Sequence, residues 1–310
     1  MSAVTLSAAA SPNLTTLTRQ SENKLLQIDA QEFSTDFNRR PFFIDHNLVD
    51  HPLVSLPRLI ELSRILPEEH VIYHSGEIQP NTRLYGGRKT GLSSEETIRQ
   101  IEECKSWLVL RYVETDPEYR ELINAVLDEI QVYTEPLDPG MLKRQAFIFI
   151  TSPQGVTPWH TDPEYSFLFQ IRGRKSLKIV SPPPFSEEEV ESYFATGRNP
   201  DFKDEYYARA SAYDLSEGRA LHFPLTVPHW VYNGNEVAIS ISITFQTYAS
   251  ERRTIIYNTN HRLRRRGLQP TPYGKSVPKD SAKYFAFRAS RRARRLLHLP
   301  EKSYYQGYKS

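Results

Sequence analysis

The chain has 310 residues, 39% of them hydrophobic, which is enough apolar material for one large domain with appendages. A single cysteine, Cys104, excludes an intramolecular disulfide, and the lack of any run of 18 apolar residues argues against a transmembrane helix. The net charge of +2 hides an asymmetry: residues 251–310 carry 16 Lys or Arg against 3 Asp or Glu, whereas the rest carries 23 against 34. We therefore expect an acidic body with a basic tail, in a reducing, cytoplasmic compartment.

The first half of the chain is predicted to be mixed in structure. Residues 1–25 lack the basic and apolar segments of a signal peptide, so a flexible leader is expected there. Residues 26–140 are expected to form a helical and mixed part that packs on the core. Capping sequences and apolar residues at helical spacing support this interpretation. The elements predicted in this part are a short strand at 38–46 and helices at 55–66, 93–105 and 116–133.

The second half reads as a β-rich core followed by a basic extension. Residues 141–250 contain several apolar, strand-like runs and form the predicted catalytic core. An acidic segment at 186–197 is predicted to be a helix or an irregular excursion between strands. Residues 251–310 are predicted to be a basic, helical C-terminal extension with a helix at 279–299.

Three residues in this core have the identities and spacing of a metal site. His160 and Asp162 form an H-x-D sequence, and His229 follows after 66 further residues, just before another strand-like run. Two His and one carboxylate hold a non-haem Fe(II) on one face of an octahedron and leave three positions open. Because alternate residues of a strand point to the same side, His160 and Asp162 can converge on one ion while Trp159 points away. An isolated H-x-D is also found in surface turns, but the strand-like segments around this one favour a metal site.

Lys175 is a candidate for binding an anion inside the core. Strand alternation over 174–179 places Lys175 on the same face as Leu177 and Ile179. A charged residue on an inward, apolar face needs a partner of opposite charge, because burial of an unpaired charge is costly. The alternative is a lysine on an edge strand whose amine reaches solvent.

Residues from about 145 to 247 resemble the JmjC-type, cupin-like 2-oxoglutarate oxygenases, especially their asparaginyl-hydroxylase branch. The resemblance rests on TPWHTD, FLFQIRGRK and LKIVSPPPF, in this order and spacing. It implies a mainly β fold with flanking helices around a double-stranded β-helix, or jelly-roll, core. It also implies that Thr157, Lys175 and Thr244 bind 2-oxoglutarate. The family's Gly-to-Pro run, here 218–224, selects His229 rather than His222 as the distal ligand.

The activity implied by this resemblance is that of a 2-oxoglutarate-dependent dioxygenase. Such enzymes use Fe(II) and O2, decarboxylate 2-oxoglutarate to succinate and hydroxylate an unactivated C–H bond. The expected substrate is an amino acid or another small molecule, or a side chain of a peptide or protein. Demethylation uses the same chemistry and stays open. Trp159 and Trp230 flank the ligands and are candidates for the wall of a substrate pocket, although core packing is favoured for both.

Two alternatives use the same residues differently. One is a non-enzymatic, JmjC-like regulatory protein that binds nucleic acid or an acidic partner through residues 251–310; the intact set of three ligands argues against it. The other is a different cupin enzyme, such as a sugar isomerase, and Thr157 and Lys175 at their spacing argue against that. We expect the basic tail to be mainly structural. A homodimer is also considered, nucleic-acid binding is not favoured, and no membrane association is expected.

Overall fold

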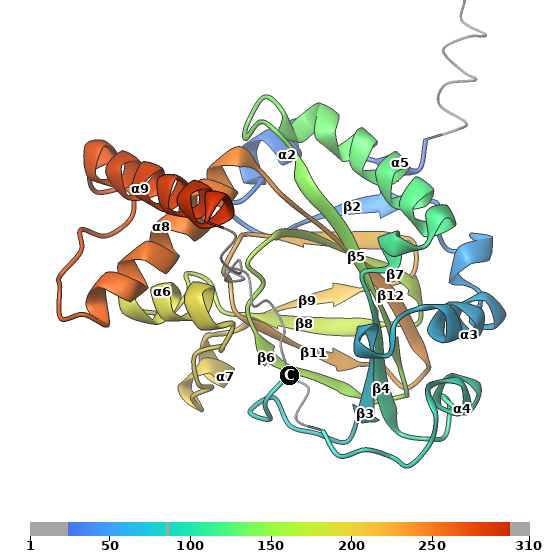
Figure 1. Cartoon of the computed structure of the whole chain (residues 1–310). Coiled ribbons are helices and arrows are strands. Elements are labelled where there is room, and N and C mark those ends of the chain that lie inside the picture. Colours follow the sequence, from blue (N-terminus) through green and yellow to red (C-terminus); the bar gives the residue numbers. More distant parts are fainter. Residues whose placement is uncertain (1–23, 85–86, 298–310) are drawn as a thin grey trace, which may run out of the picture.

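Two β-sheets face each other, and helices flank them (Figure 1). The computed structural model describes residues 24–84 and 87–297, so all but the last two residues of the expected leader lie outside it. Within this part, the larger sheet has the strand order β1-β2-β10-β7-β12-β5-β4-β3, and the smaller sheet has the order β6-β11-β8-β9. The strands are β1 (Leu26–Gln27), β2 (Phe42–His46), β3 (Val71–Ser75), β4 (Ser106–Arg111), β5 (Leu142–Thr151), β6 (Val156–His160), β7 (Tyr165–Arg172), β8 (Lys175–Ile179), β9 (Ser211–Leu215), β10 (Arg219–Phe223), β11 (His229–Asn233) and β12 (Ala238–Gln246).

The strands from β5 to β12 form a jelly roll. Strands β5, β7, β10 and β12 lie in the larger sheet, while β6, β8, β9 and β11 make up the smaller one, and their pairings are antiparallel. Consecutive strands that cross between two facing sheets define a double-stranded β-helix. Strands β1 to β4, from the N-terminal part, extend the larger sheet at both edges. The predicted N-terminal part therefore contributes strands to the sheet as well as helices that cover it.

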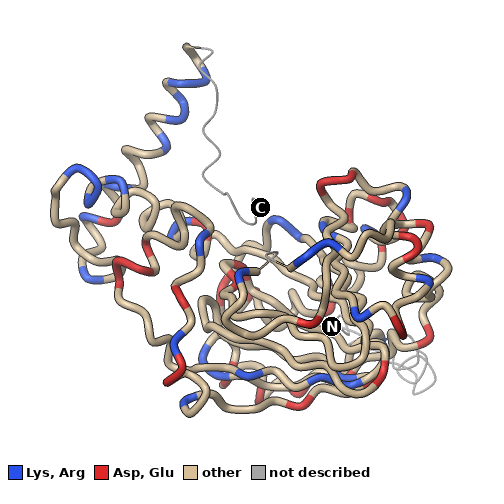
Figure 2. Tube along the Cα trace, turned by 90° about the horizontal axis from the view of Figure 1, so that it is seen from below, with Lys and Arg blue, Asp and Glu red and all other residues tan. Residues whose placement is uncertain are grey.

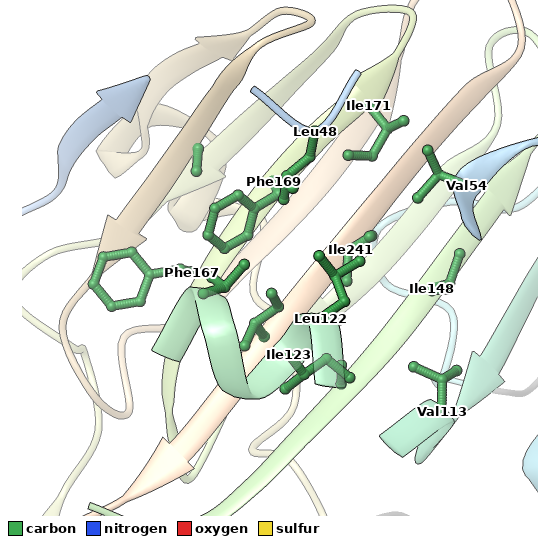
Figure 3. Packing of buried hydrophobic residues seen from close by; sticks show 14 of the residues in the cluster. Leu48, Val54, Val113, Leu122, Ile123, Ile148, Phe167, Phe169, Ile171 and Ile241 are labelled. Carbon is green, nitrogen blue, oxygen red and sulfur yellow. The ribbon is translucent and has the colours of Figure 1, made fainter. Parts of the chain in front are cut away.

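The larger sheet has an apolar outer face and a more polar inner face because its strands alternate. On β12, Ile239, Ile241 and Ile243 belong to the main hydrophobic cluster, whereas the residues between them are hydroxylated. Figure 3 shows Leu122 and Ile123 of a helix, α5 (Pro117–Thr134), packed over this outer face. Burial of each such side chain contributes about 1.5–3 kcal/mol. The core thus lies between the sheet and the helices, and the inner face is left to line a cavity.

The helices follow most of the sequence predictions. The helices predicted at 55–66, 116–133 and 186–197 are present, and the one predicted at 279–299 is found at Val277–Leu296, with residues 298–299 outside the described part of the chain. The helix predicted at 93–105 ends at Arg99 and continues in turns toward β4. Ser93 and Glu96 form the expected capping box of that helix. Besides α5, the described helices are α2 (Ala30–Asp36), α3 (Leu56–Ile65), α4 (Ser94–Arg99), α6 (Glu187–Thr196), α7 (Glu205–Arg209), α8 (Tyr248–Arg264) and α9 (Val277–Leu296), with short 3-10 turns η1 (Pro52–Val54), η2 (Glu68–His70) and η3 (Val113–Thr115).

The basic extension begins with α8, which packs against the acidic helix α6. Arg264 Nε lies 2.5 Å from Glu191 Oε2, and Asn260 donates a hydrogen bond of 2.8 Å to Glu191 Oε1. The following helix, α9, contacts α8 and projects from the body with Lys and Arg along it (Figure 2). Among the described helices, none has the length and apolar character needed to cross a membrane.

Candidate active site

The three predicted metal ligands come together where β6 and β11 pair. His160 lies opposite His229 in this antiparallel pair, and Asp162 follows just after the end of β6. One ligand atom from each residue lies within 4.8 Å of the other two. Asp162 Oδ1 is 4.0 Å from His160 Nε2, and its Oδ2 is 3.9 Å from His229 Nε2. Within residues 24–84 and 87–297, His160, Asp162 and His229 therefore form a group that could hold a metal ion.

Both imidazoles are oriented as metal ligands. His160 Nδ1 lies 2.7 Å from the carbonyl of Pro158, and His229 Nδ1 lies 3.2 Å from the carbonyl of Val227. Because a carbonyl only accepts, each Nδ1 carries a proton, and each Nε2 is turned toward the space that it shares with the carboxylate of Asp162, where a metal ion would bind. Burial, followed by the nearby His160 ring, lowers the pKa of His229 to about 4, so its imidazole is neutral near pH 7, as metal binding requires.

His222, the competing candidate for distal ligand, lies on β10 of the other sheet. Its Nδ1 is 2.9 Å from the carbonyl of Ser166, and its Nε2 accepts a hydrogen bond of 3.2 Å from the backbone N–H of Asn38. Both ring nitrogens are therefore engaged in backbone contacts. It lies outside the group formed by the other three ligands.

Lys175 points into the interior of the barrel from β8. The strand alternates as predicted, with Lys175, Leu177 and Ile179 buried, and Lys175 is only 5% exposed. Its ammonium donates a hydrogen bond of 2.5 Å to Ser240 Oγ on β12. Burial lowers the pKa of Lys175 to about 7, because no anion in the described part of the chain offsets the desolvation of the amine.

One cavity connects the ligands with Lys175, Thr157 and Thr244. It encloses about 50 Å³ of free space between the two sheets. Thr244 Oγ1 is buried and has no hydrogen-bond partner among the described residues, whereas Thr157 Oγ1 accepts a hydrogen bond of 2.9 Å from Trp107 Nε1. The cavity is lined by Leu84, Phe147, Phe149, Thr157, His160, Asp162, Glu164, Ser166, Leu168, Lys175, Phe223, His229, Val231, Ser242 and Thr244.

The two candidate tryptophans lie outside this cavity. Trp159 and Trp230 point away from the ligands and pack with Tyr206 of α7 and with Phe202 in an aromatic cluster. Trp159 also lines a second, outer groove, and its Nε1 donates a hydrogen bond of 2.9 Å to the carbonyl of Pro200. Their placement follows from strand alternation, since each directly neighbours a ligand in the sequence.

Glu164 is a cavity residue that the sequence interpretation missed. It is 4% exposed and lines the cavity two residues after Asp162. Burial, and then the charge of Asp162, raises the pKa of Glu164 to about 8. The H-x-D-x-E spacing was the available signal, because it places a third polar residue at every second position. Glu164 lies in the loop after β6, where strand alternation does not predict the direction of a side chain.

No family model and no curated protein sequence matches the chain. Solved structures do match. An X-ray structure of ycfD from Escherichia coli aligns with a TM-score of 0.51 at 17% identity, covering 89% of this chain and 69% of that one. A crystal structure described as the Escherichia coli ribosomal oxygenase YcfD aligns with a TM-score of 0.49 at 17% identity, covering 89% of this chain and 68% of that one. A complex of YcfD with cobalt and 2-oxoglutarate aligns with a TM-score of 0.45 at 15% identity, covering 86% of this chain and 67% of that one. The likeness to ycfD confirms the predicted fold class, mainly β with flanking helices around a double-stranded β-helix.

Proposed function

We propose that this chain is an Fe(II)- and 2-oxoglutarate-dependent oxygenase that hydroxylates a side chain of a peptide or protein. The observation that carries the proposal is the convergence of His160, Asp162 and His229 in one cavity with the buried amine of Lys175. Two imidazoles and a carboxylate are the donor set of non-haem Fe(II) oxygenases. A reducing, cytoplasmic setting is part of the proposal, because it keeps iron ferrous and suits a chain with one cysteine.

The cavity residues fit a dicarboxylate co-substrate. The buried amine of Lys175 contacts the neutral hydroxyl of Ser240 and no anion among the described residues, and Thr244 Oγ1 has no hydrogen-bond partner there. A bound carboxylate would offset both deficits, since buried charges and hydroxyls require hydrogen-bonded partners. Lys175 and Thr244, together with Thr157, would hold 2-oxoglutarate.

Bound Fe(II) and 2-oxoglutarate would supply the electrons that activate O2 for attack on a C–H bond. The chain's own residues orient and shield the site. The carbonyls of Pro158 and Val227 fix the tautomers of the two histidines, and Phe147, Phe149 and Phe223 line the cavity with apolar surface. Such surface limits access of bulk water to the reacting centre.

A polypeptide substrate is supported by a second groove that adjoins the cavity at Leu84. This groove has about 300 Å³ of free space, and it shares Leu84 with the inner cavity of about 50 Å³. Segments 80–84 and 196–202 line it with amide, hydroxyl and charged side chains. The narrow inner cavity suits a single side chain, while the polar groove suits the flanking backbone.

The test of this function begins with metal and turnover. The protein is loaded anaerobically with Fe(II), mixed with 2-oxoglutarate and a peptide mixture, and then exposed to O2. We expect succinate release that requires O2, together with a peptide that gains the mass of one oxygen atom. His229→Ala should lose stoichiometric Fe(II) binding and turnover, whereas the control His222→Gln should keep both. The ligand assignment would be contradicted if His229→Ala still bound Fe(II) and His222→Gln did not.

A second test addresses Lys175. Removal of one partner of a buried charge pair costs about 3–5 kcal/mol, or two to three decades in affinity. Lys175→Met should therefore raise the dissociation constant for 2-oxoglutarate by about a hundredfold or more while Fe(II) binding is kept. An unchanged dissociation constant would show that the lysine does not bind the co-substrate.

A further inference from the structure

The hydroxyl of Thr157 has one defined partner on its outer side. Trp107 Nε1 donates a hydrogen bond of 2.9 Å to Thr157 Oγ1, and both side chains are buried. An indole N–H only donates, and a threonine hydroxyl has one hydrogen to donate. The bond to Trp107 therefore occupies a lone pair of Thr157 and leaves its hydroxyl hydrogen for another acceptor.

The hydroxyl hydrogen of Thr157 can be donated to a molecule that is bound in the cavity. Thr157 lines the cavity that contains the metal ligands and Lys175. In the described part of the chain, the hydrogen bond from Trp107 is the one found at Thr157 Oγ1, and no protein group accepts from it. Thr157 is thus prepared to donate to a molecule in the cavity.

Trp107 itself is held rigidly outside the cavity. It lies on β4, its side chain is 0% exposed, and its ring stacks on His74 with a centroid distance of 4.8 Å and an interplanar angle of 15°. Phe149 contacts it at a centroid distance of 5.8 Å and, unlike Trp107, lines the cavity wall. A well-packed indole cannot turn its N–H away from Thr157 without loss of these contacts.

We propose that Trp107 is a positioning residue for the co-substrate: its indole N–H fixes the hydroxyl of Thr157 so that the hydroxyl hydrogen points at a carboxylate oxygen of 2-oxoglutarate. This inference rests on the proposed function. Without the indole donor, the hydroxyl of Thr157 rotates, and an alternative orientation with its hydrogen turned from the cavity competes with binding.

The test measures affinity without turnover. Calorimetry gives the dissociation constant of the Mn(II)-loaded protein for 2-oxoglutarate in a double-mutant cycle. Trp107→Phe keeps an aromatic ring and removes the donor, and it should weaken binding about three- to tenfold, the range for one hydrogen bond. Thr157→Val should weaken binding at least as much, because it removes the hydroxyl that donates to 2-oxoglutarate. In the Thr157→Val background, Trp107→Phe should have no further effect, because the group it positions is absent.

Three results would overturn the inference. One is an unchanged affinity in Trp107→Phe, and another is the same loss in both backgrounds, which would indicate packing alone. The third is a failure of wild type to bind 2-oxoglutarate, which would overturn the proposed function as well and is recognised before any variant is made. If Trp107→Phe loses thermal stability or Mn(II) affinity, 3-benzothienylalanine at position 107 removes the donor at nearly constant shape, and the same predictions apply to it.

Discussion

His222 shows how a buried residue that resembles a ligand acts instead on stability. Its ring is 0% exposed and packs against Phe37, Phe42 and Phe167, with centroid distances of 5.0, 5.2 and 4.7 Å. Burial lowers the pKa of His222 from 6.5 to about 4, despite the contact with the carbonyl of Ser166. The folded protein therefore holds a neutral imidazole at a pH where the unfolded chain binds a proton.

This difference predicts a specific pH dependence of stability. Between pH 6.5 and about 4 the unfolded state binds more protons at this residue, so the free energy of unfolding falls as the pH falls. The contribution is fully present above pH 6.5, and its loss by pH 4 corresponds to roughly 3 kcal/mol. His222→Gln keeps a donor and an acceptor but does not titrate. Urea denaturation across this range should show a shallower decline for the variant, and equal slopes for both proteins would contradict the assignment.

At the scale of elements, α8 fixes α6, and α6 contacts the chain between His160 and Asp162, just after the end of β6. The carboxylate of Glu191 on α6 has 0% side-chain exposure and is bound by Arg264 and Asn260 of α8. The hydroxyl of Tyr193, also on α6, donates to the carbonyl of Thr161, which lies between two of the ligands. The C-terminal extension thereby supports the candidate active site from a distance in sequence.

Arg264→Met should reveal this support. It leaves Glu191 buried without its cation, and the free energy of unfolding should fall by about 3–5 kcal/mol. The matched control is Arg265→Met at the neighbouring exposed position, which should change stability by about 0.5 kcal/mol or less. Addition of Glu191→Gln to Arg264→Met should restore part of the loss, since it removes the buried charge. Thermal and urea denaturation of the three variants measure the effect, and a similar loss in both single Arg variants would count against a specific pair.

At the scale of the whole molecule, the charge asymmetry of the sequence corresponds to two different surfaces. Within the basic tail, α8 packs against the acidic helix α6, and Arg264 pairs with Glu191 across this contact. The next helix behaves differently: α9 keeps Val277, Phe285 and Leu296 more than 60% exposed, and Figure 2 shows it projecting outward. The packing of α8 and the exposure of α9 divide the extension into a part fixed to the body and a part directed away from it.

Deletion of residues 277–310 tests the prediction that the tail is mainly structural. We expect the truncated protein to lose thermal stability or an oligomeric contact, measured by calorimetry and by light scattering. Nucleic-acid retention should be weak in both proteins, whereas a phosphate-binding tail would give affinity that falls steeply with salt. A stable, active truncation that has lost tight, salt-sensitive binding to RNA or DNA would favour the regulatory alternative.

Local patterns in the sequence were sufficient for a large share of the fold and of the candidate site. Alternation along 174–179 predicted which face of β8 carries Lys175, and capping boxes with 3–4 spacing predicted most helices. The residue types and spacing of His160, Asp162 and His229 predicted the metal ligands. In the structure, one ligand atom from each of them lies within 4.8 Å of the other two. These features are readable because strand and helix periods repeat over a few residues.

Other features depend on the pairing of distant strands, and only the tertiary structure decided them. His229 faces His160 because β11 pairs with β6 in one register, and Trp107 meets Thr157 across 50 residues of sequence. The burial that raises the pKa of Glu164 likewise comes from closure of the two sheets around the cavity. No local period encodes such contacts, because they depend on which strands become neighbours when the apolar face of the larger sheet is buried under its helices.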